Sequence, residues 1–239
     1  MAAGPAGASS PAGAVVPAGA TGTAGANGPS SATGTAGRPH PAGHLFVLIG
    51  PGGAGKTAII SAILSTRPAV RFIPTTTTRP PRPSEQHGRE YFFVSDSDFT
   101  ELRVRGDLLE SERTHGNWYG TSRRRIAELL AAGRVGITSL DYRGGQAVRS
   151  AFPRQTTTIF VRPGSLDELR ARLEARPGAN DADVRARLER ASEEMAHAQE
   201  CDYIVENGNS GLDGAVGTVL RIMDHRLGRQ EADGGLNHR

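Results

Sequence analysis

Residues 44–67 restrict the fold of this chain more than any other part of its sequence. The apolar run HLFVLI (44–49) has the composition of a buried strand, GPGGAGKT (50–57) follows it directly, and TAIISAILSTR (57–67) has the apolar spacing of a helix. The middle segment matches the pattern G-x-x-x-x-G-K-[ST] at every fixed position. Glycines let backbone N–H groups turn inward around phosphate oxygens, and the helix N-terminus adds partial positive charge. The segment therefore predicts a nucleotide phosphate-binding loop.

The side chains of this loop have predicted roles. The Lys56 ammonium is expected to reach the β- and γ-phosphates of ATP, and the Thr57 hydroxyl to ligate Mg²⁺. Lys56 is the single lysine among 28 basic residues, and the chain otherwise uses arginine. The predicted cofactors are therefore ATP and Mg²⁺. The loop residues predicted to bind them are Gly50, Gly52, Gly53, Ala54, Gly55, Lys56 and Thr57.

Composition divides the chain into three parts. Residues 1–43 are almost all Ala, Gly, Pro, Ser and Thr, which cannot bury enough apolar surface to offset an ordering entropy of ~1–2 kcal/mol per residue. We expect a disordered tail there, one globular domain over 44–228 and a disordered C-terminal tail over 229–239.

No run of 18 or more apolar residues occurs, so no membrane span is expected. Cys201 is the only cysteine, which excludes an intrachain disulfide and favours a reducing cytoplasm.

The net charge of +3 does not indicate nucleic-acid binding. The arginines are interspersed with acids on predicted helices, as in RARLERASEE (185–194), and neither a polybasic tract nor interleaved aromatics occur. We expect a small-molecule acceptor as partner, no nucleic acid, no membrane, and a monomer or homodimer.

Strands and helices alternate over most of the domain. Strands are predicted at 135–141, 156–162 and 202–206, and helices at 121–132, 182–200 and 212–227. A further helix follows the capping box formed by Ser165 and Glu168. This alternation predicts an α/β fold with a P-loop NTPase-type parallel sheet and helices on both faces.

The section 75–113 interrupts the alternation. Its first part, TTTTRPPRPSEQHGRE (75–90), contains prolines and a glycine that are expected to exclude a helix or a central strand. Short strands at 90–94 and 108–112 flank a helix for which Ser95 or Asp96 is the expected cap. The sequence therefore predicts an inserted β-rich lobe.

Several motifs in order resemble the guanylate kinase family across roughly residues 44–225. TTRPPRP (77–83) resembles the family's T-T-R-x-P-R-P segment, YFFV (91–94) its Y-x-F-V strand, and GNWYGT (116–121) its G-N-x-Y-G-[ST] turn. The resemblance implies phosphoryl transfer from ATP to GMP. It also implies an acceptor-binding lobe at about 75–121 and a helical lid at about 172–190.

The resemblance assigns roles to residues outside the loop. Guanidinium groups and phenols suit a phosphate dianion, and the residues assigned to it are Arg79, Arg82, Tyr91 and Tyr119. A carboxylate accepts from the adjacent N1–H and N2–H₂ donors of guanine, and the residues assigned to that edge are Thr75, Glu110, Thr121 and Asp141. The lid is implied to bring arginines over the transferring phosphoryl group, and these are Arg172, Arg176 and Arg187. Asn207 matches the family position near the adenine. No general base is expected, because a phosphate with a second pKa near ~6 is already largely dianionic.

The strand before Asp141 departs from the family pattern [DE]-x-D-x-Q-G. Ser139 replaces the first acid and Arg143 the glutamine, so these departures lie on the acceptor side. A second hypothesis is therefore a guanylate-kinase-like phosphotransferase for another small molecule, such as a specialised metabolite or a modified peptide. A third is a non-catalytic protein-binding module of the family. Such modules typically lose the phosphate loop, which this chain retains.

Overall fold

The computed structural model describes residues 43–114, 116–175, 178–208 and 211–235. The predicted N-terminal tail lies outside these residues except for Gly43, which belongs to the domain. Its N–H donates to the Leu130 carbonyl at 3.3 Å, and a Cβ at this position would lie 2.6 Å from the same oxygen. None of the helices formed by the described residues combines the length and the hydropathy that crossing a membrane needs.

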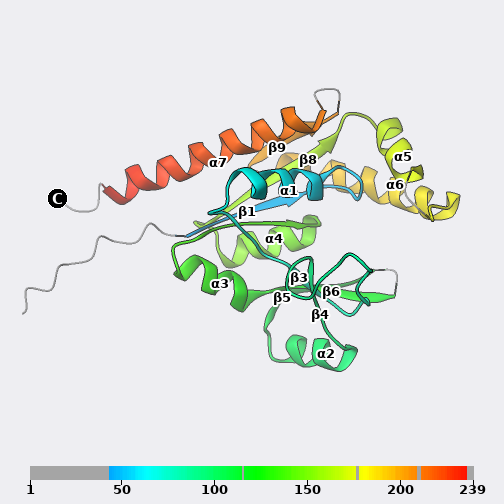
Figure 1. Cartoon of the computed structure of the whole chain (residues 1–239), viewed down its shortest axis with the longest axis horizontal. Coiled ribbons are helices and arrows are strands. Elements are labelled where there is room, and N and C mark those ends of the chain that lie inside the picture. Colours follow the sequence, from blue (N-terminus) through cyan, green and yellow to red (C-terminus); the bar gives the residue numbers. More distant parts are fainter. Residues whose placement is uncertain (1–42, 115, 176–177, 209–210, 236–239) are drawn as a thin grey trace, which may run out of the picture. The chain divides into compact units, whose positions relative to one another are not determined.

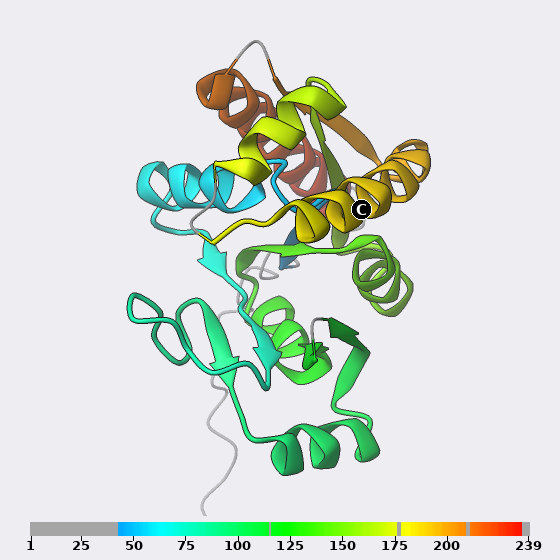
Figure 2. The ribbon, with the colours of Figure 1, turned by 90° about the vertical axis from the view of Figure 1, so that its right-hand side faces the viewer.

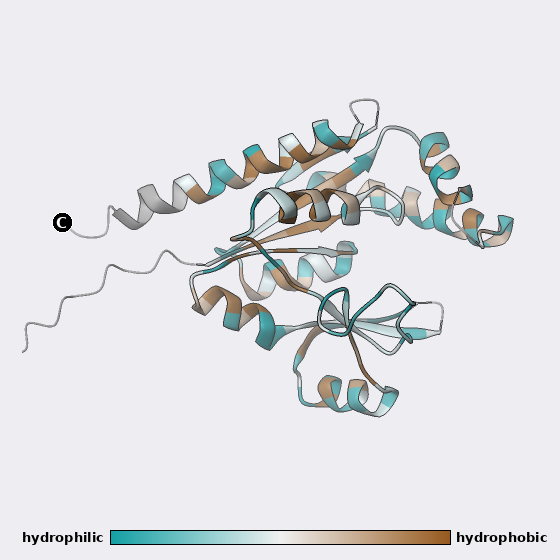
Figure 3. Cartoon of the chain, viewed as in Figure 1, coloured by the Kyte–Doolittle hydropathy of each residue, from teal (hydrophilic) through white to brown (hydrophobic). Residues whose placement is uncertain are grey.

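The larger sheet has five parallel strands in the order β2-β7-β1-β8-β9, and Figure 1 labels β1, β8 and β9 of it. They are β1 (His44–Ile49), β2 (Arg71–Phe72), β7 (Val135–Leu140), β8 (Thr156–Pro163) and β9 (Tyr203–Asn207). All six residues of the middle strand, β1, are buried, as a strand covered on both faces requires. Figure 3 shows hydrophobic residues along it.

Helices cover both faces of this sheet (Figures 1 and 2). One face carries α1 (Lys56–Thr66) and α7 (Gly211–Gly235), and the other carries α3 (Arg123–Ala131) and α4 (Tyr142–Ala151). Alternate residues of β1 separate the two cores, because Phe46 and Leu48 pack with α1 and α7 while Leu45 and Val47 pack with α3 and α4. Each buried side chain of this size stabilises the fold by about 1.5–3 kcal/mol. The predicted P-loop NTPase-type fold is confirmed.

The helices α5 (Leu166–Glu174) and α6 (Asp181–Ala196) span the segment for which the resemblance implies a lid, and a 3₁₀ helix (Ala198–Glu200) follows. They pack on each other through a small apolar core of Leu169, Leu173, Val184 and Ala191. Ser165 caps α5 by accepting from the Glu168 N–H at 3.0 Å. The Glu168 carboxylate accepts from the Gly164 N–H at 3.1 Å rather than from Ser165, so the predicted capping box forms in one direction only.

The smaller sheet forms the inserted lobe, with the strand order β4-β3-β6-β5. Its elements are β3 (Thr75–Thr77), β4 (Tyr91–Phe93), β5 (Leu108–Thr114), β6 (Asn117–Ser122) and the helix α2 (Asp96–Val104). Ser95 caps α2 in a complete capping box with Asp98. The lobe that the sequence predicted is therefore present.

Two predictions within the lobe were wrong. Residues 75–77 form an inner strand, although 75–90 was expected to contain none. The prolines begin only at residue 80, and the β-branched threonines before them suit a strand. Residues 116–121 were interpreted as a turn, but most of them belong to β6, which pairs with β3 and β5.

The C-terminal boundary also differs from the prediction. Helix α7 continues from Gly211 to Gly235, so residues 229–235 are helical where a disordered tail was expected. The helix was predicted to end at residue 227, but the glycine that follows, Gly228, costs only about 1 kcal/mol in a helix, and no proline follows it. Residues 236–239 lie outside the described part of the chain.

Candidate active site

The loop between β1 and α1 has a backbone conformation that requires glycine. Gly50, Gly53 and Gly55 have φ of 138°, 105° and 94°, values that other residues rarely adopt. A Cβ at Gly50 would lie 2.5 Å from the Val161 carbonyl oxygen, and one at Gly55 would lie 2.1 Å from Nδ2 of Asn207. Both the conformation and the close approach of neighbouring atoms therefore exclude side chains at these positions.

The loop forms one wall of a cavity of about 910 Å³. Lys56 lines it and donates hydrogen bonds through Nζ to the carbonyls of Gly50 and Pro51, the latter at 3.0 Å. The exposed Thr57 also lines it, in the first turn of α1. The predicted phosphate-binding side chains therefore face one space at the carboxyl end of β1.

Asn207, for which the resemblance implies a position near the adenine, packs against the phosphate-binding loop. It is buried, and its side-chain amide donates to the Ala54 carbonyl at 2.7 Å, behind the loop. Its own carbonyl accepts from Nη2 of Arg172 at 2.8 Å. Asn207 therefore supports the loop, because the end of β9 lies directly against Gly55.

The structure brings one of the three predicted lid arginines to the loop. Arg187 lines the 910 Å³ cavity, and its guanidinium lies 3.8 Å from the position of a Cβ at Gly52. Its Nε donates to Asp183 at 2.8 Å, which fixes the side chain on α6. Arg172 instead binds the carbonyl of Asn207. Arg176 lies outside the described residues.

A second cavity, of about 330 Å³, adjoins the loop. It lies between the carboxyl end of β7 and the lobe. Of the residues predicted to bind the acceptor, those that line it are Thr75, Tyr91, Glu110, Tyr119 and Asp141. Lys56 and Ser139 line both this cavity and the 910 Å³ cavity, so the two spaces share a wall.

Glu110 is held in this pocket by Thr121. The hydroxyl of Thr121, a residue that is 2% exposed, donates to Oε1 of Glu110 at 2.7 Å. Burial raises the pKa of Glu110, the Thr121 hydrogen bond opposes this, and the charge of Asp141 raises it further. Thr121 was predicted to contact the acceptor, and in the structure its hydroxyl is directed at Glu110.

Asp141 begins α4 and faces the same pocket. Its Oδ1 accepts from the Gly144 N–H at 2.7 Å, which caps the helix. A Cβ at Gly144 would lie 3.2 Å from this oxygen and 3.5 Å from the carboxyl carbon of Glu110. The absence of a side chain at Gly144 therefore leaves room for both carboxyl groups.

Arg79 lies beside the pocket and is paired with Glu85. Its Nη2 donates to both carboxylate oxygens of Glu85 at 2.9 Å, and its guanidinium lies 5.3 Å from the centre of the Tyr91 ring. The Arg82 N–H donates to the same carboxylate at 2.8 Å. Burial alone would raise the pKa of Glu85, but the hydrogen bonds from Arg82 and Arg79 lower it.

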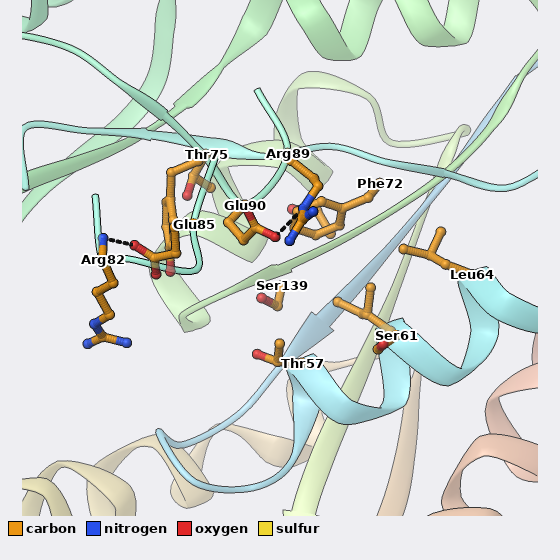
Figure 4. A pocket seen from close by; sticks show the side chains of 13 residues that line it. Thr57, Ser61, Leu64, Phe72, Thr75, Arg82, Glu85, Arg89, Glu90 and Ser139 are labelled. Carbon is orange, nitrogen blue, oxygen red and sulfur yellow. Dashed lines mark hydrogen bonds and ion pairs between the residues drawn. The ribbon is translucent and has the colours of Figure 1, made fainter. Parts of the chain in front are cut away.

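A third cavity, of about 560 Å³, separates α1 from the lobe. Figure 4 shows Thr57 and Ser61 of α1 on one side, and Thr75, Glu85 and Glu90 of the lobe on the other. The Arg82 side chain extends away from Glu85 in this view, and it lines both this cavity and the 910 Å³ cavity. Arg82, which the resemblance assigns to the acceptor phosphate, is therefore directed at the space in front of the loop.

Sequence reasoning missed three acidic residues near these cavities. Glu85 pairs with Arg79, Glu112 lines the 330 Å³ cavity, and Glu194 reaches the same cavity from α6. Oε2 of Glu194 is buried and has no hydrogen-bond partner among the residues that the structure describes. Burial raises the pKa of Glu194, and the charge of Lys56 opposes the shift. Only Glu112 had a signal in the sequence, because it lies two residues after Glu110 on a predicted strand.

Comparisons with known proteins identify relatives of this chain. The family model described as guanylate kinase matches residues 42–226. The guanylate kinase of Bordetella pertussis is 42% identical over 167 residues, which cover 70% of this chain and 77% of the relative. That of Dechloromonas aromatica is 44% identical over 194 residues, 80% and 95% of the two chains. A crystal structure of guanylate kinase from Anaplasma phagocytophilum shares the fold, with a TM-score of 0.63 at 24% identity over 78% of this chain and 87% of that one.

Proposed function

Because the chain belongs to the guanylate kinase family, we propose that it transfers the γ-phosphoryl group of ATP to GMP, which gives ADP and GDP. The observation that carries the proposal is that Lys56 lies between two cavities and lines both of them. This ammonium lines both the cavity in front of the phosphate-binding loop and the pocket that contains Glu110. A phosphoryl group that passes from a donor in the first space to an acceptor in the second stays within reach of one cation.

ATP is placed by the loop and the start of α1. Backbone N–H groups of residues 50–57 and the helix N-terminus suit the triphosphate, and Lys56 suits its β- and γ-phosphates. The described residues contain no group of three or more His, Cys, Asp or Glu that could hold a metal. A single hydroxyl, that of Thr57, fits Mg²⁺, which is usually bound through one or two protein groups and the substrate phosphates. With the nucleotide bound, Mg²⁺ supplies charge neutralisation at the phosphates.

The acceptor phosphate is assigned to the residues around Glu85. Arg79 and Arg82 offer guanidinium groups, and Tyr91 and Tyr119 lie with their ring centres 6.1 Å apart. The acceptor base is assigned to Glu110, held by Thr121, with Thr75 and Asp141 beside it. Two adjacent N–H donors of guanine fit a carboxylate, whereas adenine lacks them at that edge.

Catalysis in this proposal consists of positioning and electrostatic stabilisation. The attacking oxygen belongs to the GMP phosphate, which is already a dianion, so no side chain needs to remove a proton from it. Lys56 and Arg187, on two sides of the 910 Å³ cavity, stabilise charge that spreads over the transferring group. We assign the same role to Arg172 and Arg176 in a closed state of the lid, in which they would reach the transferring phosphoryl group.

The test is ADP release with a panel of acceptors: GMP, dGMP, IMP, AMP and UMP. GMP and dGMP should be phosphorylated, IMP more slowly because it lacks the N2 amine, and AMP and UMP not measurably. Lys56→Ala serves as the control for contaminating kinases. Absence of GMP turnover in a preparation that binds ATP would contradict the proposal, and turnover of another acceptor alone would identify the second hypothesis.

A further inference from the structure

The side chain of Glu194 lines the 330 Å³ cavity from α6, a helix outside the lobe. Arg187, on the same helix, lines the 910 Å³ cavity. Seven residues make almost two helical turns, so these two side chains lie on one face of α6, about 10 Å apart along its axis. That face therefore spans the donor and acceptor sides of the proposed site, and Glu194 is its charged group on the acceptor side.

The carboxyl group of Glu194 has an unused hydrogen-bond acceptor. Its Oε2 is buried and makes no hydrogen bond with any residue in the described part of the chain. Buried polar oxygens nearly always have a donor, because burial without one forfeits the hydrogen bonds that water would make. The missing donor is one that a ligand bound in the 330 Å³ cavity can supply.

The end of α6 that carries Glu194 is fixed to the start of α4. His197, three residues further on, stacks on the ring of Tyr142, with the ring centres 4.1 Å apart and the planes at 14°. The Tyr142 hydroxyl donates to the Glu200 carboxylate, and Nδ1 of His197 is hydrogen-bonded to the same carboxylate at 2.7 Å. The His197 N–H donates to the Glu194 carbonyl at 3.1 Å. The backbone of Glu194 is therefore held beside the cavity before any ligand arrives, which lowers the entropic cost of binding to it.

The chemistry of GMP suggests what this donor is. In the proposed function the guanine edge is assigned to Glu110, and the phosphate to arginines and tyrosines of the lobe. The ribose hydroxyls are donors of GMP that have no assigned partner. A carboxylate suits them, because it accepts from hydroxyl groups in charge-assisted hydrogen bonds, as acids do at the ribose in dinucleotide-binding folds. It does not suit the phosphate, which carries charge of the same sign.

We propose that Glu194 is a specificity-determining residue that accepts a hydrogen bond from a ribose hydroxyl of the acceptor nucleotide. The inference rests on the proposed function, which takes GMP as the acceptor. It gives the sugar a partner on α6, whereas the base and the phosphate are assigned mainly to the lobe. An acceptor that lacks this hydroxyl leaves the Glu194 carboxylate without a donor and is therefore phosphorylated less efficiently.

The test compares kcat/KM for GMP, dGMP and 3′-deoxyGMP in the wild type and in Glu194→Ala. The wild type should prefer GMP to at least one of the two deoxy analogues by roughly 10-fold, the effect of one hydrogen bond to a charged group. In Glu194→Ala this preference should fall below about twofold, because the variant loses kcat/KM for GMP but not for that analogue. Equal losses for all three acceptors, which a structural role or an effect on Lys56 would produce, would overturn the inference. So would a wild type that uses all three acceptors equally well.

Glu189→Ala is the matched control, because it removes the same group at an exposed position of the same helix. Its preference among the three acceptors should equal that of the wild type. Glu194→Gln keeps an acceptor oxygen without the charge, so its preference should lie between those of the wild type and Glu194→Ala. This variant also decides the question if Glu194→Ala does not fold, because an unreduced preference in Glu194→Gln would overturn the charge-assisted hydrogen bond.

Titration calorimetry with the same three nucleotides separates the two proposals without turnover. If GMP is bound but not phosphorylated, the proposed function is wrong, and the inference stands only if Glu194→Ala removes the difference in Kd between GMP and a deoxy analogue. If GMP is phosphorylated with the same sugar preference in the wild type and in Glu194→Ala, the inference alone is wrong. Failure of GMP to bind would overturn both.

Discussion

Nη2 of Arg79 donates hydrogen bonds to both carboxylate oxygens of Glu85, at 2.9 Å each. The pair is largely buried, with 15% of the Arg79 side chain and 11% of the Glu85 side chain exposed. A charge-assisted pair in this environment fixes the orientation of the guanidinium. Its Nη1 donates to the Pro80 carbonyl at 2.8 Å, so the side chain is held before any ligand arrives. Glu85 therefore positions an arginine that we assign to the acceptor phosphate.

We predict that Glu85→Gln raises KM for GMP by roughly 10-fold, because an amide offers Arg79 one acceptor oxygen and no charge. KM for ATP should remain within about twofold, since Glu85 lies on the lobe. Steady-state kinetics with each substrate varied in turn measures both. Glu101→Gln, an exposed change on helix α2 of the same lobe, is the control. Equal effects on the two substrates would contradict a positioning role.

Lys56→Ala should lower kcat by at least about 100-fold, because Lys56 is the cation common to the donor and acceptor cavities. Lys56→Arg should also be impaired, since a planar guanidinium does not replace a compact ammonium in a closely fitted loop. The melting temperature of both variants should stay close to that of the wild type, as a check on folding. Turnover near the wild-type rate in Lys56→Ala would remove the loop from the mechanism.

We predict that burial of His44 makes the free energy of unfolding fall in acid. Its Nε2 is hydrogen-bonded to the Thr157 hydroxyl at 2.8 Å, and burial, with the charge of Arg226, lowers its pKa to about 4. Asp202 opposes the shift. His44 takes up a proton near pH 6.5 in the unfolded chain but only near pH 4 in the folded chain. The contribution of neutral His44 to the free energy of unfolding is therefore fully present above pH 6.5 and is lost as the pH is lowered towards 4. The loss attributable to His44 is about 2–3 kcal/mol at pH 4.5.

Urea unfolding at several pH values measures this effect. His44→Gln cannot take up the proton, and its amide can still pair with Thr157. Its free energy of unfolding should therefore fall less than that of the wild type between about pH 7 and pH 4.5. Parallel curves for the two proteins would show that another group causes the acid sensitivity.

Apolar spacing and glycine positions in the sequence predicted those parts of the fold that are determined by neighbouring residues. The strand, loop and helix over 44–67 follow from apolar spacing and fixed glycines, and the parallel sheet follows from alternating elements. Helix α4 was not predicted, because Gly144 and Gly145 disfavour a helix on propensity. The structure supplies the reason for them. A Cβ at Gly145 would lie 2.2 Å from Cδ1 of Ile49, so α4 packs against β1 at a distance that only glycine permits.

In the candidate site too, the residues carried by sequence motifs were predicted, whereas the contacts that depend on tertiary packing were not. Glu110 and Tyr119 were predicted because the family motifs carry them in order, and the structure brings them to one pocket. The sequence did not predict the hydrogen bond from Asn207 to the Ala54 carbonyl, because that contact depends on how β9 packs against the loop. Glu85 was missed for a related reason. An acid in a polar loop resembles a solvated surface residue until the fold places it against Arg79.

The hydrogen bond from Thr121 to Glu110 gives the sharpest test of the acceptor. Glu110→Gln presents an amide N–H₂ to the N–H donors of guanine, which leaves donors unpaired in a buried pocket. Each unpaired group costs about 1–3 kcal/mol, so kcat/KM for GMP should fall roughly 10- to 1000-fold. KM for ATP should be almost unchanged, because the donor cavity is formed by other residues.

Thr121 should act only through Glu110. Thr121→Val removes the 2.7 Å hydrogen bond at nearly constant volume and should lower kcat/KM for GMP by roughly 5- to 30-fold. Thr121→Ser keeps the hydroxyl and should recover most of the activity, which makes it the matched control. The double variant Glu110→Gln with Thr121→Val should then be no worse than about Glu110→Gln alone, since the hydroxyl has lost the carboxylate that it positions. Strictly additive losses in this cycle would mean that Thr121 contacts the acceptor directly, and wild-type kcat/KM in Glu110→Gln would exclude Glu110 from guanine recognition.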